Sequence, residues 1–309
     1  MIMRLSSPFY LFLATLFMGA PVYAQQGEGK PELSYTGSLQ TSYEHHSNIS
    51  VVELDTAIND SDSALALDLN LDASLQLNQR TRVDAGYGLS ERQYTEYPSY
   101  DLRTHLLYVD ASHDVASVTI GANHYYADAL LAREGFMSLN QSSLYAARLF
   151  GNQWYVRTSV LLAHKRFDEL AERSADATGV MGNLFWFSND AQRFVSLGLS
   201  LNDEDAVEDE FSYSGWALRL GVSQRMTLWQ RDARLQLNAR WVERDYQAES
   251  SWIEVVREDT QLLAEAQFSV ALFDWLSAVT QLERGRYRST LPTADYAETR
   301  LAVGMRASF

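Results

Sequence analysis

The chain has 309 residues, of which 46% are hydrophobic, 12% are aromatic and 21% are charged, and it contains no cysteine. The missing cysteine excludes disulfide bonds, thiolate metal sites, a cysteine nucleophile and the acylated N-terminus of a lipoprotein. A formal net charge of −15 excludes nucleic-acid binding through neutralisation of phosphates.

The N-terminus predicts a cleaved signal peptide over residues 1–24. Arg4 supplies the positive start, and the apolar run 9–18 is too short to span a bilayer as a helix. We expect cleavage after Ala24, followed by a short periplasmic lead over 25–31. No later stretch is apolar enough for a membrane helix, so contact with a membrane would have to use strands.

The remainder of the chain, 32–309, repeats one pattern in which segments of about ten residues alternate between apolar and polar positions. Segment 63–77 is the clearest, with a leucine or alanine at nearly every second position. About fourteen segments can be recognised. They cover 33–44, 63–77, 81–92, 101–112, 116–126, 138–150, 153–166, 176–188, 193–202, 211–226, 232–244, 258–272, 275–288 and 297–309.

The breaks between these segments alternate in length. Short breaks are expected at Asn78–Arg80, His113–Asp114, Gly151–Asn152, Asn189–Asp190, Thr227–Arg231 and Phe273–Asp274. Longer polar breaks cover 45–62, 93–100, 127–137, 167–175, 203–210, 245–257 and 289–295. This rhythm predicts an all-β fold, a transmembrane antiparallel up-and-down β-barrel of about fourteen strands with both termini at the short-turn end.

The last segment places apolar residues on one face and charged or small residues on the other. Its outward positions include Leu301, Val303, Met305 and the terminal Phe309, a pattern that resembles the targeting strand of outer-membrane barrels. We therefore expect this strand to be recognised by the barrel-assembly machinery. The outer face would contact outer-membrane lipid and lipopolysaccharide, which places the protein in the outer membrane of a Gram-negative cell.

The inward positions of the predicted strands carry many charges. They are Arg82, Arg157, Arg219, Arg225, Arg234, Arg240, Arg300, Arg306, Asp68, Asp72, Asp84, Glu265 and Glu298. Two interpretations remain open, a water-filled pore that selects by charge and a set of ion pairs that only stabilises the wall.

Acidic residues are also concentrated in two of the longer breaks. The first holds Glu53, Asp55, Asp60 and Asp62, and the fifth holds Asp203, Glu204, Asp205, Glu208, Asp209 and Glu210. Divalent cations bridging lipopolysaccharide could bind there, but the spacing matches no calcium loop. A solvated acidic surface is favoured, and no metal or cofactor is predicted.

A candidate catalytic group lies where the first segment meets its loop. His45 and Ser47 belong to a His-x-Ser-Asn sequence that resembles the motif of outer-membrane lipid acyl hydrolases. In such enzymes a histidine activates the serine and a third polar residue, here Asn59, orients the histidine. The alternative is a polar turn with no catalytic role.

The stretch Tyr43-Glu44-His45-His46-Ser47-Asn48-Ile49 is similar to the Tyr-x-x-x-Ser-Asn-Ile/Val sequence at the first loop of surface lipoprotein assembly modifier barrels. The size and strand number of 32–309 agree with that resemblance. It covers the barrel only, because residues 25–31 leave no room for the helical repeats that usually precede it. The resemblance implies a non-enzymatic barrel for passage or surface display of a protein, polymer or solute, with an exported lipoprotein or a periplasmic protein as partner. A small-solute porin and a lipid acyl hydrolase are the alternatives.

Overall fold

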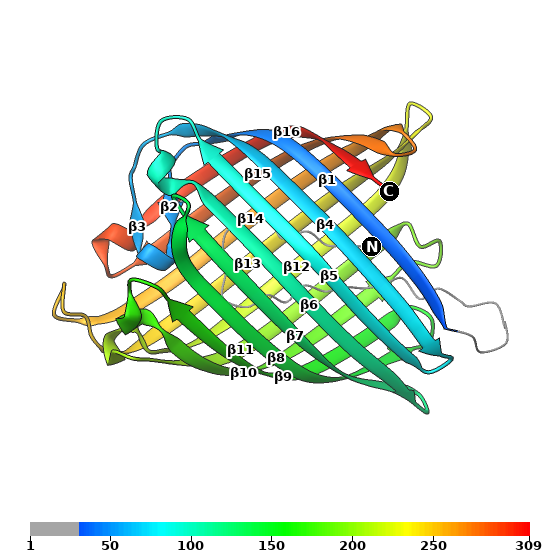
Figure 1. Cartoon of the computed structure of the whole chain (residues 1–309), viewed down its shortest axis with the longest axis horizontal. Helices are drawn as coiled ribbons and strands as arrows, with labels where there is room; N and C mark the ends of the chain where they lie inside the picture. Colours follow the sequence, from blue (N-terminus) through cyan, green and yellow to red (C-terminus); the bar gives the residue numbers. More distant parts are fainter. Residues whose placement is uncertain (1–30) are drawn as a thin grey trace.

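The computed structural model describes residues 31–309, and the predicted signal peptide and all but the last residue of the predicted lead lie outside these residues. Fourteen strands form one closed barrel in which each strand pairs with its neighbours in sequence and β1 pairs with β16 (Figure 1). The strands are β1 Glu32–His46, β4 Asp62–Asn78, β5 Thr81–Tyr94, β6 Leu102–Val115, β7 Val118–Leu131, β8 Glu134–Phe150, β9 Trp154–Phe167, β10 Ala175–Phe187, β11 Arg193–Ala206, β12 Tyr213–Leu228, β13 Arg231–Glu249, β14 Val256–Phe273, β15 Leu276–Ser289 and β16 Tyr296–Ser308.

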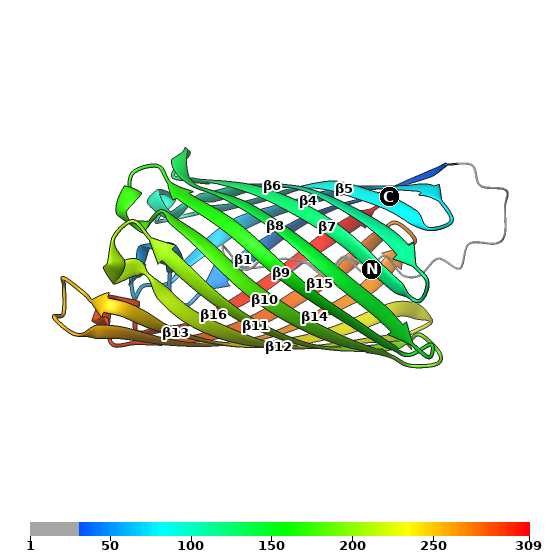
Figure 2. The ribbon, with the colours of Figure 1, turned by 90° about the horizontal axis from the view of Figure 1, so that it is seen from below.

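The loops at one end contain the remaining short elements. They are β2 Ser50–Val51, β3 Thr56–Ala57 and the 3₁₀ turns η1 Val52–Leu54, η2 Pro98–Tyr100, η3 Ala171–Arg173, η4 Asp209–Phe211 and η5 Pro292–Ala294. Figures 1 and 2 show these loops at one end of the barrel, with the C-terminus at the opposite, short-turn end. Within residues 31–309 there is no helix of the length and hydrophobicity needed to cross a bilayer.

The barrel closes where the first and last strands meet. The register runs from Ser38 opposite Ser308 to His46 opposite Arg300. The terminal Phe309 extends this ladder, because Gly37 donates to its carbonyl at 2.7 Å and its own N–H donates to the Gly37 carbonyl at 3.0 Å. The Phe309 ring lies over Gly37, where a Cβ would come within 2.3 Å of the ring. A glycine at this position therefore leaves room for the aromatic residue that completes the seam.

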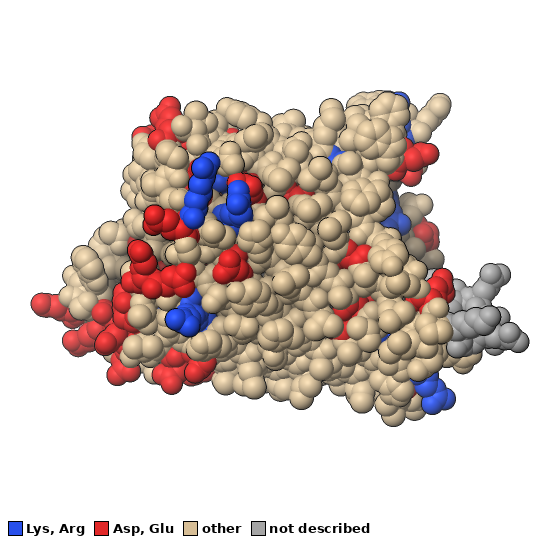
Figure 3. Space-filling view, in the orientation of Figure 1, with Lys and Arg blue, Asp and Glu red and all other residues tan. Residues whose placement is uncertain are grey.

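The two faces of the wall differ in chemistry because successive residues of a strand point in opposite directions. Outward residues such as Leu144, Leu162 and Val303 are more than half exposed, whereas the inward Gln141 and Gln281 are buried. Figure 3 shows a middle zone with few charged side chains and a concentration of acidic side chains at the loop end. An apolar outer belt around a polar interior is the arrangement expected of an outer-membrane barrel.

The predicted fold class and strand number are confirmed. The turn predicted at His113–Asp114 is wrong, because both residues still pair with β7 and the reversal occurs at 116–117, where Ala116 has φ 55°. Several strands also continue beyond the predicted limits at the loop end. β11 reaches Ala206 and β13 reaches Glu249, since strand pairing continues above the apolar belt where polar residues occupy both faces.

Candidate functional site

The first loop does not extend into solvent but folds inward at the loop end of the barrel. We define the inner segment as residues 48–59, which contains β2, η1 and β3. Ile49 is fully buried and Val51 is 3% exposed. The segment is a small hairpin in which Ser50 pairs with Ala57 and Val51 with Thr56. Figures 1 and 2 place β2 and β3 within the outline of the barrel at its loop end.

Apolar residues of the inner segment pack on both halves of the barrel wall. Val51 belongs to a buried cluster with residues of β6 to β10, and Leu54 packs against the same cluster. On the other side, Val52 and Ala57 pack against a cluster of Leu263, Tyr287 and Tyr296 from β14, β15 and β16. The inner segment therefore spans the lumen and contacts opposite walls.

A buried carboxylate fixes the far end of the inner segment. Asp55 accepts hydrogen bonds from Arg173 of η3 at 2.7 Å and from Arg257 of β14 at 2.6 Å. Arg173 also donates to the carbonyl of Glu53 at 2.6 Å, and Arg257 makes a second ion pair with Asp259 at 2.7 Å. Hydrogen bonds between ionised partners are about twice as strong as neutral ones, so this arrangement acts as a clamp.

The near end of the inner segment rests on a charge cluster of β1, β5, β15 and β16. Ser50 donates to Glu298 at 3.0 Å, and Glu298 lies 2.8 Å from the ring of His46. His46 in turn lies 3.1 Å from Glu44. Glu44 and Glu283 pair with two arginines of the same wall, Arg92 at 3.2 Å from Glu44 and Arg300 at 2.9 Å from Glu283. The first loop is thus attached to the wall from which it leaves.

The wall opposite β1 carries a further buried charge pair. Lys165 of β9 donates to Glu204 of β11, and the hydroxyl of Tyr213 donates to the other oxygen of Glu204 at 2.9 Å. Both charged side chains are less than 10% exposed. A buried ion pair of this kind is stable only when both charged groups keep their hydrogen-bond partners, because an unpaired buried charge destabilises the fold.

The two acidic residues of the inner segment titrate in opposite directions. Burial raises the pKa of Glu53 to about 8. Burial also opposes ionisation of Asp55, but the hydrogen bonds and positive charges of Arg257 and Arg173 outweigh it and hold the pKa of Asp55 below its ordinary value. The clamp thus works with an ionised Asp55, while the position of Glu53 favours a neutral carboxyl.

These contacts correct the prediction of solvated acidic loops. Glu53 and Asp55 are buried inside the barrel mouth rather than exposed. Asp203, Glu204 and Asp205 belong to β11, and Glu204 faces the lumen. The prediction failed there because a run of acidic residues hides the alternation of a strand. Asp60, in contrast, is exposed and accepts the Tyr97 hydroxyl at 2.6 Å.

Most of the predicted lumen charges have a partner on the same strand or on a strand one to three positions away in the barrel. The observed pairs are Arg82–Asp84, Arg157–Asp110, Arg300–Glu283, Arg306–Gln40, Asp68–Ser90, Asp72–Tyr108, Glu265–Asn238 and Glu298–His46. The other four are arginines of β12 and β13, of which Arg225 and Arg240 also interact with other groups. In the cross-strand register Arg219 lies opposite Arg240 and Arg225 lies opposite Arg234.

The three residues of the predicted catalytic group have different partners. His45 lies 3.3 Å from the hydroxyl of Ser63. The hydroxyl of Ser47 accepts the backbone N–H of Thr299 at 2.8 Å, and the backbone N–H of Asn59 donates to Asn48 at 2.9 Å. The structure does not assemble them into a triad.

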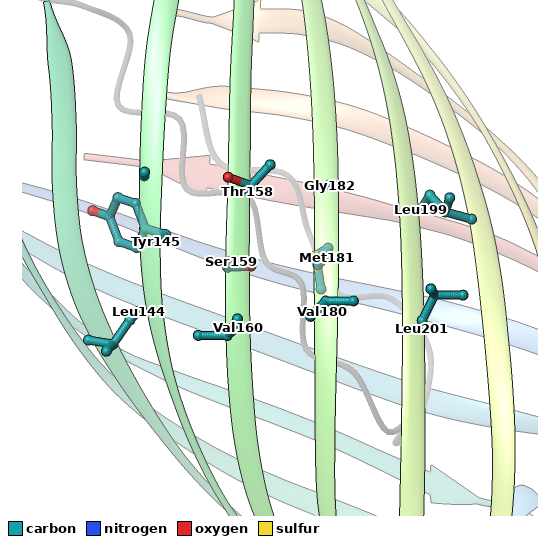
Figure 4. Close-up of a pocket in the computed structure, with 11 residues that line it drawn as sticks. Leu144, Tyr145, Thr158, Ser159, Val160, Val180, Met181, Gly182, Leu199 and Leu201 are labelled. Atoms are coloured by element: carbon teal, nitrogen blue, oxygen red, sulfur yellow. The ribbon is translucent and has the colours of Figure 1, made fainter.

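One depression of about 510 Å³ lies across β8 to β11 (Figure 4). Cross-strand neighbours Ala146, Thr158 and Gly182 form a row of small residues there, and the larger Val160 and Val180 lie beside it. These residues belong to the apolar outer face, so the depression offers no converging polar groups for chemistry. Among residues 31–309, no group of three or more histidine, cysteine, aspartate or glutamate side chains is placed to hold a metal ion.

Sequence reasoning missed several residues that build the site. Alternation puts Glu44 at an inward position of β1, but Glu44 is not among the predicted lumen charges, and its surroundings His46 and Arg92 and the distant Lys165 are not predicted either. Alternation predicted which way these side chains point. It could not predict that the first loop turns inward to meet them, because that depends on contacts between residues far apart in the chain.

Comparisons with known proteins agree with this architecture. The profile of a family described as "surface lipoprotein assembly modifier" matches residues 36–309. The fold is similar to the outer membrane channel DcaP of Acinetobacter baumannii, with a TM-score of 0.56, 9% identity and coverage of 90% of this chain and 97% of that one. It is also similar to the outer membrane protein OmpT of Vibrio cholerae, with a TM-score of 0.54, 9% identity and coverage of 90% and 99%. None of the curated proteins matches the chain in sequence.

Proposed function

The chain belongs to the surface lipoprotein assembly modifier family, and from this membership we propose that it is a non-enzymatic barrel of the outer membrane that serves the surface display of a lipoprotein. The cargo passes through, or is released beside, the lumen after the first loop moves aside. The partners are the lipoprotein, the surrounding lipid and lipopolysaccharide, and the barrel-assembly machinery that inserts the last strand.

The inner segment is the observation that carries this proposal. It joins opposite walls through the Asp55 clamp and through Ser50, and its apolar residues are packed on both sides. A loop that is held across the barrel mouth suits a barrel that opens only when cargo arrives. An open small-solute pore would instead need a permanently clear mouth.

A display experiment tests the proposal. The full chain is expressed in a Gram-negative host together with a lipoprotein encoded in a neighbouring reading frame, and external protease reports how much lipoprotein has reached the surface. We expect display to depend on the barrel and to be reduced by truncation of the last strand. Equal display with and without a correctly folded barrel would refute the proposal.

Conductance in planar bilayers distinguishes a cargo-gated barrel from a small-solute porin. A cargo-gated barrel predicts silence or rare small openings from the wild-type protein, whereas a porin predicts frequent large steps. Release of the first loop by Asp55→Asn should increase the frequency of openings in the cargo-gated case. A wild-type protein that conducts as freely as the variant would favour the porin.

A further inference from the structure

The charged residues of the lumen are not distributed evenly around the ring. β12 is separated from β5 by the same number of strands in either direction, so the two strands lie opposite each other, as do β4 and β11, and β6 and β13. The walls of β4, β5 and β6 carry four inward carboxylates, Asp68, Asp72, Asp84 and Asp110, and two inward arginines, Arg82 and Arg92. The wall of β12 and β13 carries five inward arginines, Arg219, Arg225, Arg234, Arg240 and Arg244. The β12–β13 side of the lumen is therefore strongly basic, whereas carboxylates outnumber arginines on the opposite side.

The basic wall is built from like charges in register. Arg219 is directly opposite Arg240, and Arg225 is directly opposite Arg234. Like charges at facing positions of an antiparallel pair destabilise the sheet. A strand pair that carries two such positions on one face loses stability unless negative charge is supplied from elsewhere.

Arg219 is the clearest case. Its Nη1 and Nη2 are both buried and have no hydrogen-bond partner among residues 31–309. Arg234 likewise makes no ion pair with any residue of the described part of the chain. In contrast to Arg219, the inward Arg92, Arg157 and Arg300 each pair with a carboxylate. A guanidinium held without a partner in a confined space is a group prepared to bind an anion.

Neighbouring strands provide a suitable surrounding for such a ligand. Gly198 lies opposite Arg219 on β11, and the amide oxygen of Asn183 lies 2.9 Å from the position a Gly198 Cβ would take, so the missing side chain makes room for a polar group beside Arg219. On the same strand the Ser200 hydroxyl and the Asn202 amide nitrogen are buried without partners among the described residues. Glu265 of β14, bonded to Asn238 at 3.2 Å, is the carboxylate on the neighbouring strand.

From these observations we propose that the lumen face of β12 and β13 is a binding strip for oxyanions, with Arg219 and Arg240 forming one step and Arg225 and Arg234 the other. The guanidinium fork matches the planar geometry of a phosphate or carboxylate group. The two steps are six positions apart along β12, which corresponds to about 20 Å in an extended strand. The ligand is a water-soluble solute or segment that carries phosphate or carboxylate groups and is attracted to the basic wall of β12 and β13.

Calorimetric titration of the full, folded barrel in zwitterionic detergent at low salt tests the strip. Inorganic phosphate and citrate are titrated separately, so the two arms distinguish a phosphate from a carboxylate preference. We expect the wild-type protein to bind at least one of the two, with an affinity that falls as salt is added. Arg219→Gln should weaken that binding at least tenfold, and Arg219→Lys should restore part of it because the charge is kept.

Arg288→Gln is the matched control, because it removes one positive charge from an exposed outward position of β15. Its affinity should equal that of the wild type. Heat-modifiable migration on gels verifies that each variant has folded. Absence of binding to the wild type, the same affinity in folded Arg219→Gln, or an equal loss in Arg288→Gln would overturn the proposal. Because the assay contains no lipoprotein, its outcome is independent of the display experiment.

Discussion

The substitution Asp55→Asn should release the first loop from the barrel mouth. Asp55 is the only side chain of the inner segment seen to bridge two arginines, at 2.7 Å to Arg173 and 2.6 Å to Arg257. Removing one partner of a buried ion pair costs about 3–5 kcal/mol. The lower limit applies here, since Arg257 keeps Asp259 and Arg173 keeps the carbonyl of Glu53.

A loss of about 3 kcal/mol raises the population of the open loop about 100-fold. The chain has no cysteine, so Val51→Cys gives a single reporter thiol at a site that is 3% exposed in the closed loop. The rate at which a charged maleimide modifies this thiol follows the open population. We expect Asp55→Asn to increase the rate about 100-fold in the Val51→Cys background.

Asp60→Asn provides the control, because it removes the same charge from an exposed position of the same loop. Solvent screens the interactions of an exposed charge, so the rate should change less than about fivefold. A rate in Asp55→Asn within about threefold of its parent, or an equal increase in Asp60→Asn, would show that the clamp does not hold the loop.

Three further outcomes are expected. Burial raises the pKa of Glu53 to about 8 from an ordinary 4.5, so the closed loop binds a proton more tightly than the open loop. Closure of the loop therefore weakens as the pH rises from 4.5 to about 8. Glu53→Gln should remove this pH dependence from the labelling rate of the Val51→Cys thiol, once the rate is corrected for thiol ionisation. Gly304→Val should block closure of the seam, because a Cβ there would lie 2.1 Å from the carbonyl of Thr41, while Gly182→Ala, with open space around it, should fold normally in a heat-modifiability assay. Ser47→Ala should leave lipid hydrolysis unchanged at the level of a blank; a serine-dependent rate above the blank would restore the hydrolase alternative.

The sequence alone was enough to predict the barrel. Alternation at every second residue follows from the geometry of one strand, and lipid outside with water inside demands opposite chemistry on its two faces. Segment 63–77 and the terminal strand carried this signal without ambiguity. The direction of each predicted inward charge, including Asp68 and Arg219, followed from the same rule.

Turn positions were less certain. The ladder continues through His113 and Asp114 although both are polar residues typical of turns, because pairing with β7 outweighs local preference. The ends of β11 and β13 extend into acidic sequence for the same reason. Alternation is visible only inside the apolar belt, so strand limits above the belt could not be predicted from it.

The course of the first loop was decided by tertiary structure alone. Glu53 and Asp55 lie in a stretch whose composition is typical of a solvated loop. Nothing in residues 45–62 indicates that Asp55 forms ion pairs with Arg173 and Arg257, which are far away in the chain. Pairing between arginines of β12 and β13 likewise depends on register. The sequence by itself determined which face each side chain would take, because that is a property of a single strand. Only the closed ring decided which charges meet, since a partner across the lumen is set by strand order, register and the path of the loop.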